Sequence, residues 1–156
     1  MSSITADRTP ALTLTDELKA LVNNALAAGS PLLLAVVSPE GKPVLSYRGS
    51  AQVYSDDQIG LWARKGQGGT VDAIRANPSV VLVYRSATTP VLQFHGRARV
   101  VESGDERLRV FESAPERERA ADPERKGVAV IVDLDRVEGV LKVGPSGPQF
   151  VRLARA

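Results

Sequence analysis

Hydrophobic residues along the chain mostly alternate with polar ones or run together in short blocks, which is typical of strands. In a few segments they instead recur every three to four residues, which is typical of helices. The first helical stretch follows Thr13 and Thr15, either of which can cap a helix. Its apolar stripe continues to about Ala28, and Gly29 provides the C-terminal stop. The next block, residues 32–37, is continuously apolar with a β-branched end, which favours a buried strand.

Residues 44–54 alternate between apolar and polar side chains, so we expect one strand with two distinct faces. Arg48 and Ser50 belong to its polar face. A turn at residues 55–58 leads into a second strand, residues 59–64, and the pair predicts an antiparallel hairpin. Trp62 on that second strand is either a core or subunit-contact residue or a platform for a cofactor.

Residues 62–78 are the segment around which we organise the chain, because they combine a strand end, a basic glycine-rich turn and a short helix. Val71 and Ile74 form the inward face of this helix, and Asn77-Pro78 ends it.

The turn before that helix has the chemistry of a phosphate site. Arg64 and Lys65 supply two cations, and helix-initial N–H groups without partners carry the positive end of the helix dipole. The residues that offer these N–H groups are Gly68, Gly69 and Thr70. The alternative is a solvated turn that happens to carry two charges.

The rest of the pattern alternates strands with short helices. Further strands are expected at residues 80–85, 91–102, 128–134, 137–143 and 149–153. Ser103 to Glu106 fits a capping box at the start of one helix, and Pro115 precedes another at residues 116–121. His95 falls on the polar face of the strand at 91–102. It is either a surface or dimer-interface residue or, alternatively, a catalytic acid or base.

Tight turns between most neighbouring strands favour antiparallel pairing, since parallel pairing needs crossover helices. A mainly β fold, an antiparallel barrel closed to remove its edges and flanked by peripheral helices, is the economical solution. We expect residues 1–156 to form a single domain, with residues 1–12 as a disordered tail.

Composition excludes several classes of function. A net charge of +2 with interleaved acids and bases, and only 4% aromatic residues, argues against nucleic-acid binding. The absence of cysteine excludes thiolate chemistry, and a single histidine makes zinc sites and a Ser-His-Asp triad poor candidates, so we expect no metal. Neither a signal peptide nor an apolar run of membrane-spanning length is visible, so we expect no membrane partner and a cytoplasmic location.

Two motifs carry a family resemblance: the Ile-x-x-Asn-Pro helix stop at residues 74–78, and Phe-His-Gly-Arg-Ala at residues 94–98. With the order of elements, they make residues 32–153 similar to the FMN-binding split-barrel family typified by pyridoxamine 5'-phosphate oxidase. The resemblance implies an antiparallel split β-barrel and a homodimer that holds FMN (flavin mononucleotide) in a groove between its subunits.

The resemblance also implies where FMN phosphate binds. Arg48 and Ser50 come from the second strand, and Arg64 and Lys65 match the family's basic segment, with Ala63 in place of its serine. In the other register, counted back from Asn77-Pro78, the family's basic pair falls on Gly69 and Thr70. Both sets are retained as candidate cofactor-binding residues, together with Gly68 and Trp62.

Two departures limit the resemblance. The family often places a glutamine beside the flavin ring, and here Val91 stands at that position, with Gln93 two residues along on the same face. The Arg-x-His pair that pyridoxamine 5'-phosphate oxidases carry near their C-terminus is missing, so vitamin B6 oxidation is not expected.

We therefore expect a homodimeric flavin-binding oxidoreductase with FMN as cofactor, an unknown small-molecule substrate and no identifiable catalytic side chain. One alternative is a deazaflavin-dependent reductase on the same barrel, with Arg97 and Arg99 helping to form a basic groove. The other is a non-catalytic protein that binds flavin or haem, or that has lost its ligand.

Overall fold

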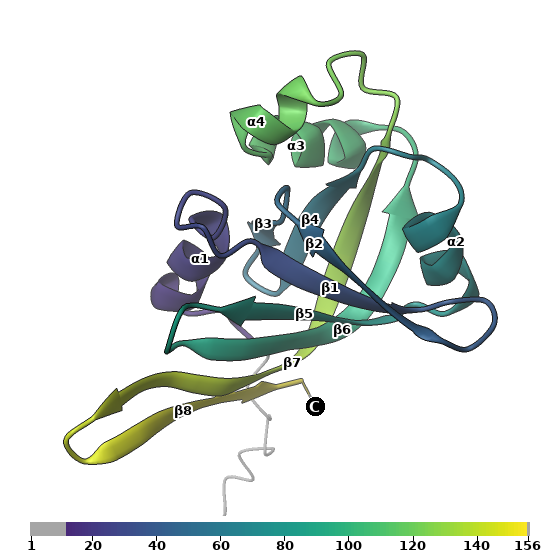
Figure 1. The fold of residues 1–156 in the computed structure, drawn as a ribbon. Coiled ribbons are helices and arrows are strands. Elements are labelled where there is room, and N and C mark those ends of the chain that lie inside the picture. The colour runs from purple at the N-terminus through teal and green to yellow at the C-terminus, as the bar shows by residue number, and fades with distance from the viewer. Residues whose placement is uncertain (1–11, 156) are drawn as a thin grey trace, which may run out of the picture.

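A computed structural model of the chain describes residues 12–155, in which eight strands and four helices are found (Figure 1). The helices are α1 (Asp16–Asn23), α2 (Gly69–Ala76), α3 (Asp105–Ser113) and α4 (Glu116–Ala120). The strands are β1 (Leu32–Val37), β2 (Pro43–Arg48), β3 (Gln52–Ser55), β4 (Gln58–Ala63), β5 (Ser79–Arg85), β6 (Val91–Val101), β7 (Val128–Gly144) and β8 (Gly147–Ala154).

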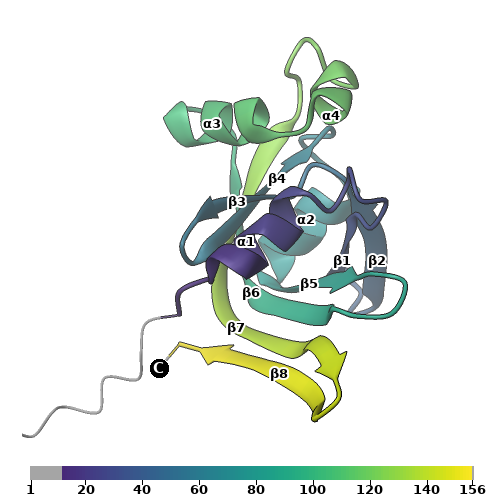
Figure 2. The same ribbon diagram turned by 90° about the vertical axis from the view of Figure 1, so that its left-hand side faces the viewer.

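All strands form one antiparallel sheet in the order β2-β1-β5-β6-β7-β4-β3, and β8 pairs with the far half of β7. The sheet curls on itself, with α1 and α2 at opposite ends of the curl (Figures 1 and 2). The expected mainly β, antiparallel split barrel is confirmed. The ring is open rather than closed, because β2 and β3 end the path without pairing with each other.

β7 is one 17-residue strand where the sequence predicts two. Asp135 is the extra residue of a β-bulge, since the register of β7 against β6 shifts between His95 and Gly96. This bulge interrupts the alternation of apolar residues along β7. The first half of β7 pairs with both β4 and β6, and the second half pairs with β6 and β8. The bulge changes the direction of the strand without ending it.

The single strand expected at residues 44–54 is instead two strands joined by a turn, in which the Ala51 N–H donates to the Arg48 carbonyl at 3.3 Å. Ser50 in this turn is 3% exposed, and its hydroxyl accepts from the Trp62 N–H at 2.9 Å and donates to the Trp62 carbonyl at 3.2 Å. Of the hairpin predicted between residues 44–54 and 59–64, only the part formed by β3 and β4 is present. β2 pairs with β1 instead.

Two helix boundaries also differ from the prediction. α1 begins at the Thr15 cap, whose hydroxyl accepts from the Leu18 N–H at 3.2 Å, but ends at Asn23 instead of continuing to about Ala28. The capping box at the start of α3 is wrong. Gly104 occupies the cap with a φ of +90°, and Glu106 pairs with Arg99 at 2.8 Å instead.

The main core fills the inside of the curled sheet. Its largest fully buried side chains include Leu34, Leu61 and Phe94, and α2 adds Val71 and Ile74 as the sequence predicts. A smaller core lies between β4, β7 and α3 and consists of Trp62, Val110, Phe111, Ala129 and Ile131. Because both faces of β4 are covered, all its residues after Gln58 are buried.

The tail expected at residues 1–12 lies outside the described residues except for Leu12, which is 3% exposed and belongs to the main core. Among residues 12–155, none of the helices has the length and apolar character needed to span a bilayer.

Gly96, which lies opposite the bulge of β7, offers a test of the packing between β6 and β7. A Cβ there would overlap the Asp133 carbonyl oxygen and lie 2.8 Å from Val132 Cγ1, so backbone would have to move. We expect Gly96→Ala to lower the free energy of unfolding by about 1–3 kcal/mol in urea titrations. Gly144→Ala is the control, since nothing lies within 4 Å of a Cβ there. Equal stability of the two variants would contradict this packing.

Candidate functional site

A recess of about 580 Å³ lies where the end of β2, the turn after β4 and the start of α2 meet. Its lining residues are Arg48, Ala63, Arg64, Lys65, Gln67, Gly68, Gly69, Thr70 and Val71. Arg48 is the last residue of β2, because the expected long strand is divided into β2 and β3. From this position its side chain contacts α2. We call this the basic recess.

Arg48 is held in place within the basic recess. Its Nη2 donates to the Thr70 hydroxyl at 2.5 Å, and its Nε donates to the Ser46 hydroxyl at 3.1 Å. Burial lowers the pKa of Arg48, the positive charge of Arg64 lowers it further, and Glu118 opposes the shift. Because the ordinary pKa of arginine is very high, the side chain remains charged at neutral pH with further N–H donors to offer.

The turn leading into α2 requires glycine at two positions. Gly68 and Gly69 have φ values of +77° and +44°, which other residues rarely adopt, although a Cβ at either would meet no atom within 4 Å. Gly68 caps the helix without any side-chain hydrogen bond. The first N–H groups of the helix therefore have no side-chain cap, belong to residues that line the recess, and carry the positive end of the helix dipole.

Arg64 and Lys65 both line the basic recess and are exposed. The two registers that the sequence left open thus do not compete, because the Arg64–Lys65 pair and the Gly68–Thr70 segment face the same space. The recess brings together cations, a hydroxyl and helix N–H groups, and the chemistry that this set recognises is a phosphate or a similar oxyanion.

Ser50 and Trp62 do not line the basic recess. The Ser50 hydroxyl is occupied by the Trp62 backbone, and the Trp62 ring is 4% exposed in the smaller core. The ring packs edge-on against Phe111 with centroids 4.9 Å apart, and its Nε1 donates to Asp122 Oδ2 at 2.8 Å. Of the two alternatives for Trp62, the structure places the ring in the core.

Gln93 lies elsewhere, on the convex side of the sheet. It is exposed and lines a different recess with Glu138 and Phe150, and its Oε1 lies 2.9 Å from His95 Nε2. His95 is half-buried, and its Nε2 lies 3.5 Å from Glu138 Oε1 on the neighbouring strand. Within one chain, Gln93 therefore does not meet the basic recess.

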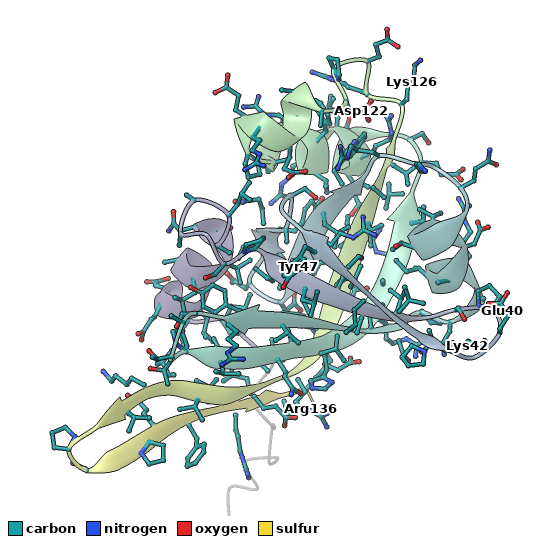
Figure 3. The ribbon with its side chains drawn as sticks, viewed as in Figure 1. Glu40, Lys42, Tyr47, Asp122, Lys126 and Arg136 are labelled. Atoms are coloured by element: carbon teal, nitrogen blue, oxygen red, sulfur yellow. The ribbon has the colours of Figure 1, made fainter. Side chains whose placement is uncertain are left out.

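The convex side of the β2-β1-β5 part of the sheet is apolar. Side chains at paired positions of neighbouring strands share a face, and this one consists of Leu33, Ala35, Leu45, Tyr47, Val81 and Val83. We call it the outer face. Tyr47, labelled on β2 in Figure 3, is 73% exposed and Leu45 is 62% exposed. Gln93 extends the face onto β6, since it pairs with Val83.

Sequence reasoning missed the residues that surround the turn from outside, namely Arg107, Glu118, Asp122 and Gly127. Glu118 of α4 lies against Gly49, next to Arg48, and contributes a negative charge there. Asp122 and Gly127 belong to the loop between α4 and β7. No local pattern marks these residues, because only the tertiary fold brings Glu118 to the turn between β2 and β3 and the other three to the end of β4.

An anion should stabilise this protein through the basic recess. We expect inorganic phosphate to raise the melting temperature, and Arg48→Met to remove most of that increase because the half-buried guanidinium is held within the recess by Thr70 and Ser46. Thr70→Val should reduce it less. Arg85→Met, which changes an exposed arginine outside the recess, is the control. Equal phosphate responses in Arg48→Met and Arg85→Met would rule out this anion site.

Comparison with known proteins places the chain in a family. The family model described as pyridoxamine 5'-phosphate oxidase matches residues 14–140. HupZ from Group A Streptococcus is 20% identical, with a TM-score of 0.65 over 87% of this chain and 98% of its own. General Stress Protein 26 from Bacillus anthracis is 17% identical, with a TM-score of 0.61 over 88% of this chain and 99% of its own.

A third solved structure, a pyridoxamine 5'-phosphate oxidase-related, FMN binding protein from Nostoc punctiforme, is 15% identical, with a TM-score of 0.60 over 88% of this chain and 93% of its own. A search of the curated proteins finds no match. At these identities the solved structures support the fold alone, whereas the family model covers most of the residues. The chain therefore belongs to the pyridoxamine 5'-phosphate oxidase family.

Proposed function

We propose that this protein binds FMN with its phosphate in the basic recess and acts as a flavin-dependent oxidoreductase. The observation that carries the proposal is the convergence of Arg48, Arg64 and Lys65 with Thr70 at the N-terminus of α2. A phosphate monoester carries nearly two negative charges and several acceptor oxygens, which this donor set matches.

Each part of the basic recess has a separate role in this proposal. Arg48, fixed by Ser46 and Thr70, offers its remaining N–H groups as an oriented fork. The N–H groups at the start of α2 would bind phosphate oxygens, and the exposed Arg64 and Lys65 would add positive charge to the site. FMN, when bound, supplies the redox chemistry, while the chain binds and orients it.

Two solved relatives support FMN as the ligand. The Nostoc punctiforme protein and a protein from Syntrophomonas wolfei are both described as FMN-binding. The substrate of this chain is a separate question, and we propose no vitamin B6 chemistry, since the single histidine, His95, is distant in sequence from the C-terminus where the family's pair occurs.

The second part of the proposal is a homodimer formed through the outer face. An apolar sheet surface of this extent, with Tyr47 and Leu45 mostly exposed, is typical of an interface. The basic recess alone accommodates the phosphate end of a flavin, and Gln93 lies on the face that we propose a second copy covers. A second subunit is thus the natural source of groups, including Gln93, for the flavin ring.

Charge placement favours FMN over a deazaflavin with an oligoglutamyl tail. Arg99 would have to attract the tail, but it is already paired with Glu106 at 2.8 Å and lies 3.8 Å from Asp133. Arg97 and Arg99 do not line the basic recess. Haem stays an alternative occupant that direct titration can test.

The phosphate contribution can be isolated by comparing FMN with riboflavin. Arg64→Glu combined with Lys65→Glu should weaken FMN binding strongly, because each lost charged hydrogen bond costs about 1.5–3 kcal/mol. Riboflavin affinity, measured by the same calorimetric titration, should be nearly unchanged. Arg97→Glu is the control for added negative charge outside the recess. The proposal fails if the double variant keeps its FMN affinity.

The oligomeric state tests the role of the outer face. Leu45→Asp combined with Tyr47→Asp should convert a dimer into a folded monomer, because charges would enter an apolar interface. Light scattering coupled to size exclusion measures the mass. Leu108→Asp provides a control, since Leu108 is an exposed apolar residue of α3, away from the outer face. A wild-type protein that is monomeric at all concentrations would disprove the dimer.

A further inference from the structure

A buried carboxylate lies next to the strand end from which the basic turn departs. Asp122 is 7% exposed in the loop between α4 and β7, at the end of the molecule where α3 and α4 lie (Figure 3). It accepts from Trp62 Nε1 at 2.8 Å, from the Gly127 N–H at 2.9 Å and from the Lys126 N–H at 3.0 Å. Its carboxylate thus ties its own loop to β4.

The same loop touches the backbone that leads into the basic recess. A Cβ at Gly127 would overlap the Ala63 carbonyl oxygen and lie 2.9 Å from Arg64 Cα, so only glycine permits this approach. Ala63 and Arg64 both line the basic recess. The loop therefore packs directly behind the first cation of the turn.

Arg107 of α3 completes this arrangement. Its Nη2 donates to the Gly127 carbonyl at 3.0 Å and also to the Arg125 carbonyl, and its guanidinium lies over the Trp62 ring at 5.0 Å. Its Nε is buried without a hydrogen-bond partner among residues 12–155. A buried unpaired donor is costly, so this contact between α3 and the loop carries a desolvation penalty.

Electrostatics keep the Asp122 carboxylate charged. Burial alone would raise the pKa of Asp122, but the donors from Lys126, Trp62 and Gly127, with the positive charge of Arg107, hold it below its usual value. Its stabilising effect is thus present above the ordinary carboxyl pKa and is lost as the pH falls through the lowered one. At neutral pH the three hydrogen bonds are at full strength.

We propose that Asp122 is a positioning residue for the phosphate site: through Trp62 and Gly127 it fixes the end of β4, and so places Arg64 and Lys65 in the basic recess. It does not line the recess. The expected effect of Asp122 on affinity for the phosphate group rests on the proposed flavin function. Its structural part, the fixing of the turn, stands independently of the ligand.

The binding test compares FMN and riboflavin in Asp122→Asn, which keeps the size of the side chain but replaces one acceptor oxygen with a donor. We expect the FMN dissociation constant to rise about tenfold, equivalent to one weakened charged contact, with riboflavin affinity unchanged. Trp62→Phe, which removes the Nε1 donor together with part of the indole ring, should shift FMN affinity in the same direction. In the double variant the two effects should add less than fully, because both changes break the hydrogen bond between Trp62 and Asp122.

A purely structural role predicts a different result. If Asp122 only stabilises the fold, Asp122→Asn lowers the melting temperature. At temperatures where the variant is still folded, the ratio of FMN affinity to riboflavin affinity would then equal that of the wild type. That outcome overturns the proposal. Ser113→Ala serves as the control for an exposed polar change in the same helical region.

Hydrogen exchange of the ligand-free protein decides the structural part without FMN. Asp122→Asn should accelerate exchange at residues 61–63, the end of β4 that pairs with β7, while amides of β6 stay protected. Unchanged exchange at residues 61–63 would overturn the proposal even if the wild type binds FMN. Conversely, a wild type that binds no FMN disproves the proposed function, and the exchange result still decides whether Asp122 holds the turn.

Discussion

The structure depends on the pairing of β7 with three other strands. Its first half connects β4 to β6, so it is the only link by backbone hydrogen bonds between the β3–β4 hairpin and the rest of the sheet among the described residues. Val130, Ile131 and Val132 are fully buried there, which makes this pairing costly to open. The bulge at Asp135 lets the same strand continue and pair with β8.

Because the sheet is open, its two ends are held together by other means, and the basic recess forms beside the gap, where the end of β2 approaches the turn after β4 and the start of α2. The turn between β2 and β3 carries the chain across the gap, and the Ser50 hydroxyl bonds to both backbone groups of Trp62 on β4. Arg48 comes from one side of the gap and Arg64 from the other, while Thr70 of α2 fixes the Arg48 guanidinium. Repulsion among these positive charges opposes the arrangement, and we propose that the loop containing Asp122 and Gly127 holds the end of β4 against it.

Sequence reasoning succeeded where a segment's own pattern decides its structure. β1 has its predicted limits, α2 buries Val71 and Ile74 and ends at Asn77-Pro78, and β6 separates Phe94 from His95 as alternation requires. The basic turn was also recognisable, since its glycines and cations are adjacent in the sequence. It failed where distant residues decide: Ser50 breaks a regular alternation to reach Trp62, and Glu106 leaves its capping role to pair with Arg99. Asp122 reaches Trp62 across 60 residues, which no local pattern reveals.

In the arrangement that we propose, one flavin phosphate occupies the basic recess of each chain in a dimer. Size exclusion of the protein after incubation with FMN, with visible absorbance and light scattering recorded together, tests this arrangement. We expect flavin absorbance to elute with the protein, in equal amounts of flavin and chain, at the mass of two chains. Flavin that elutes only with small molecules, while haem or a deazaflavin offered in the same way stays bound, would contradict it.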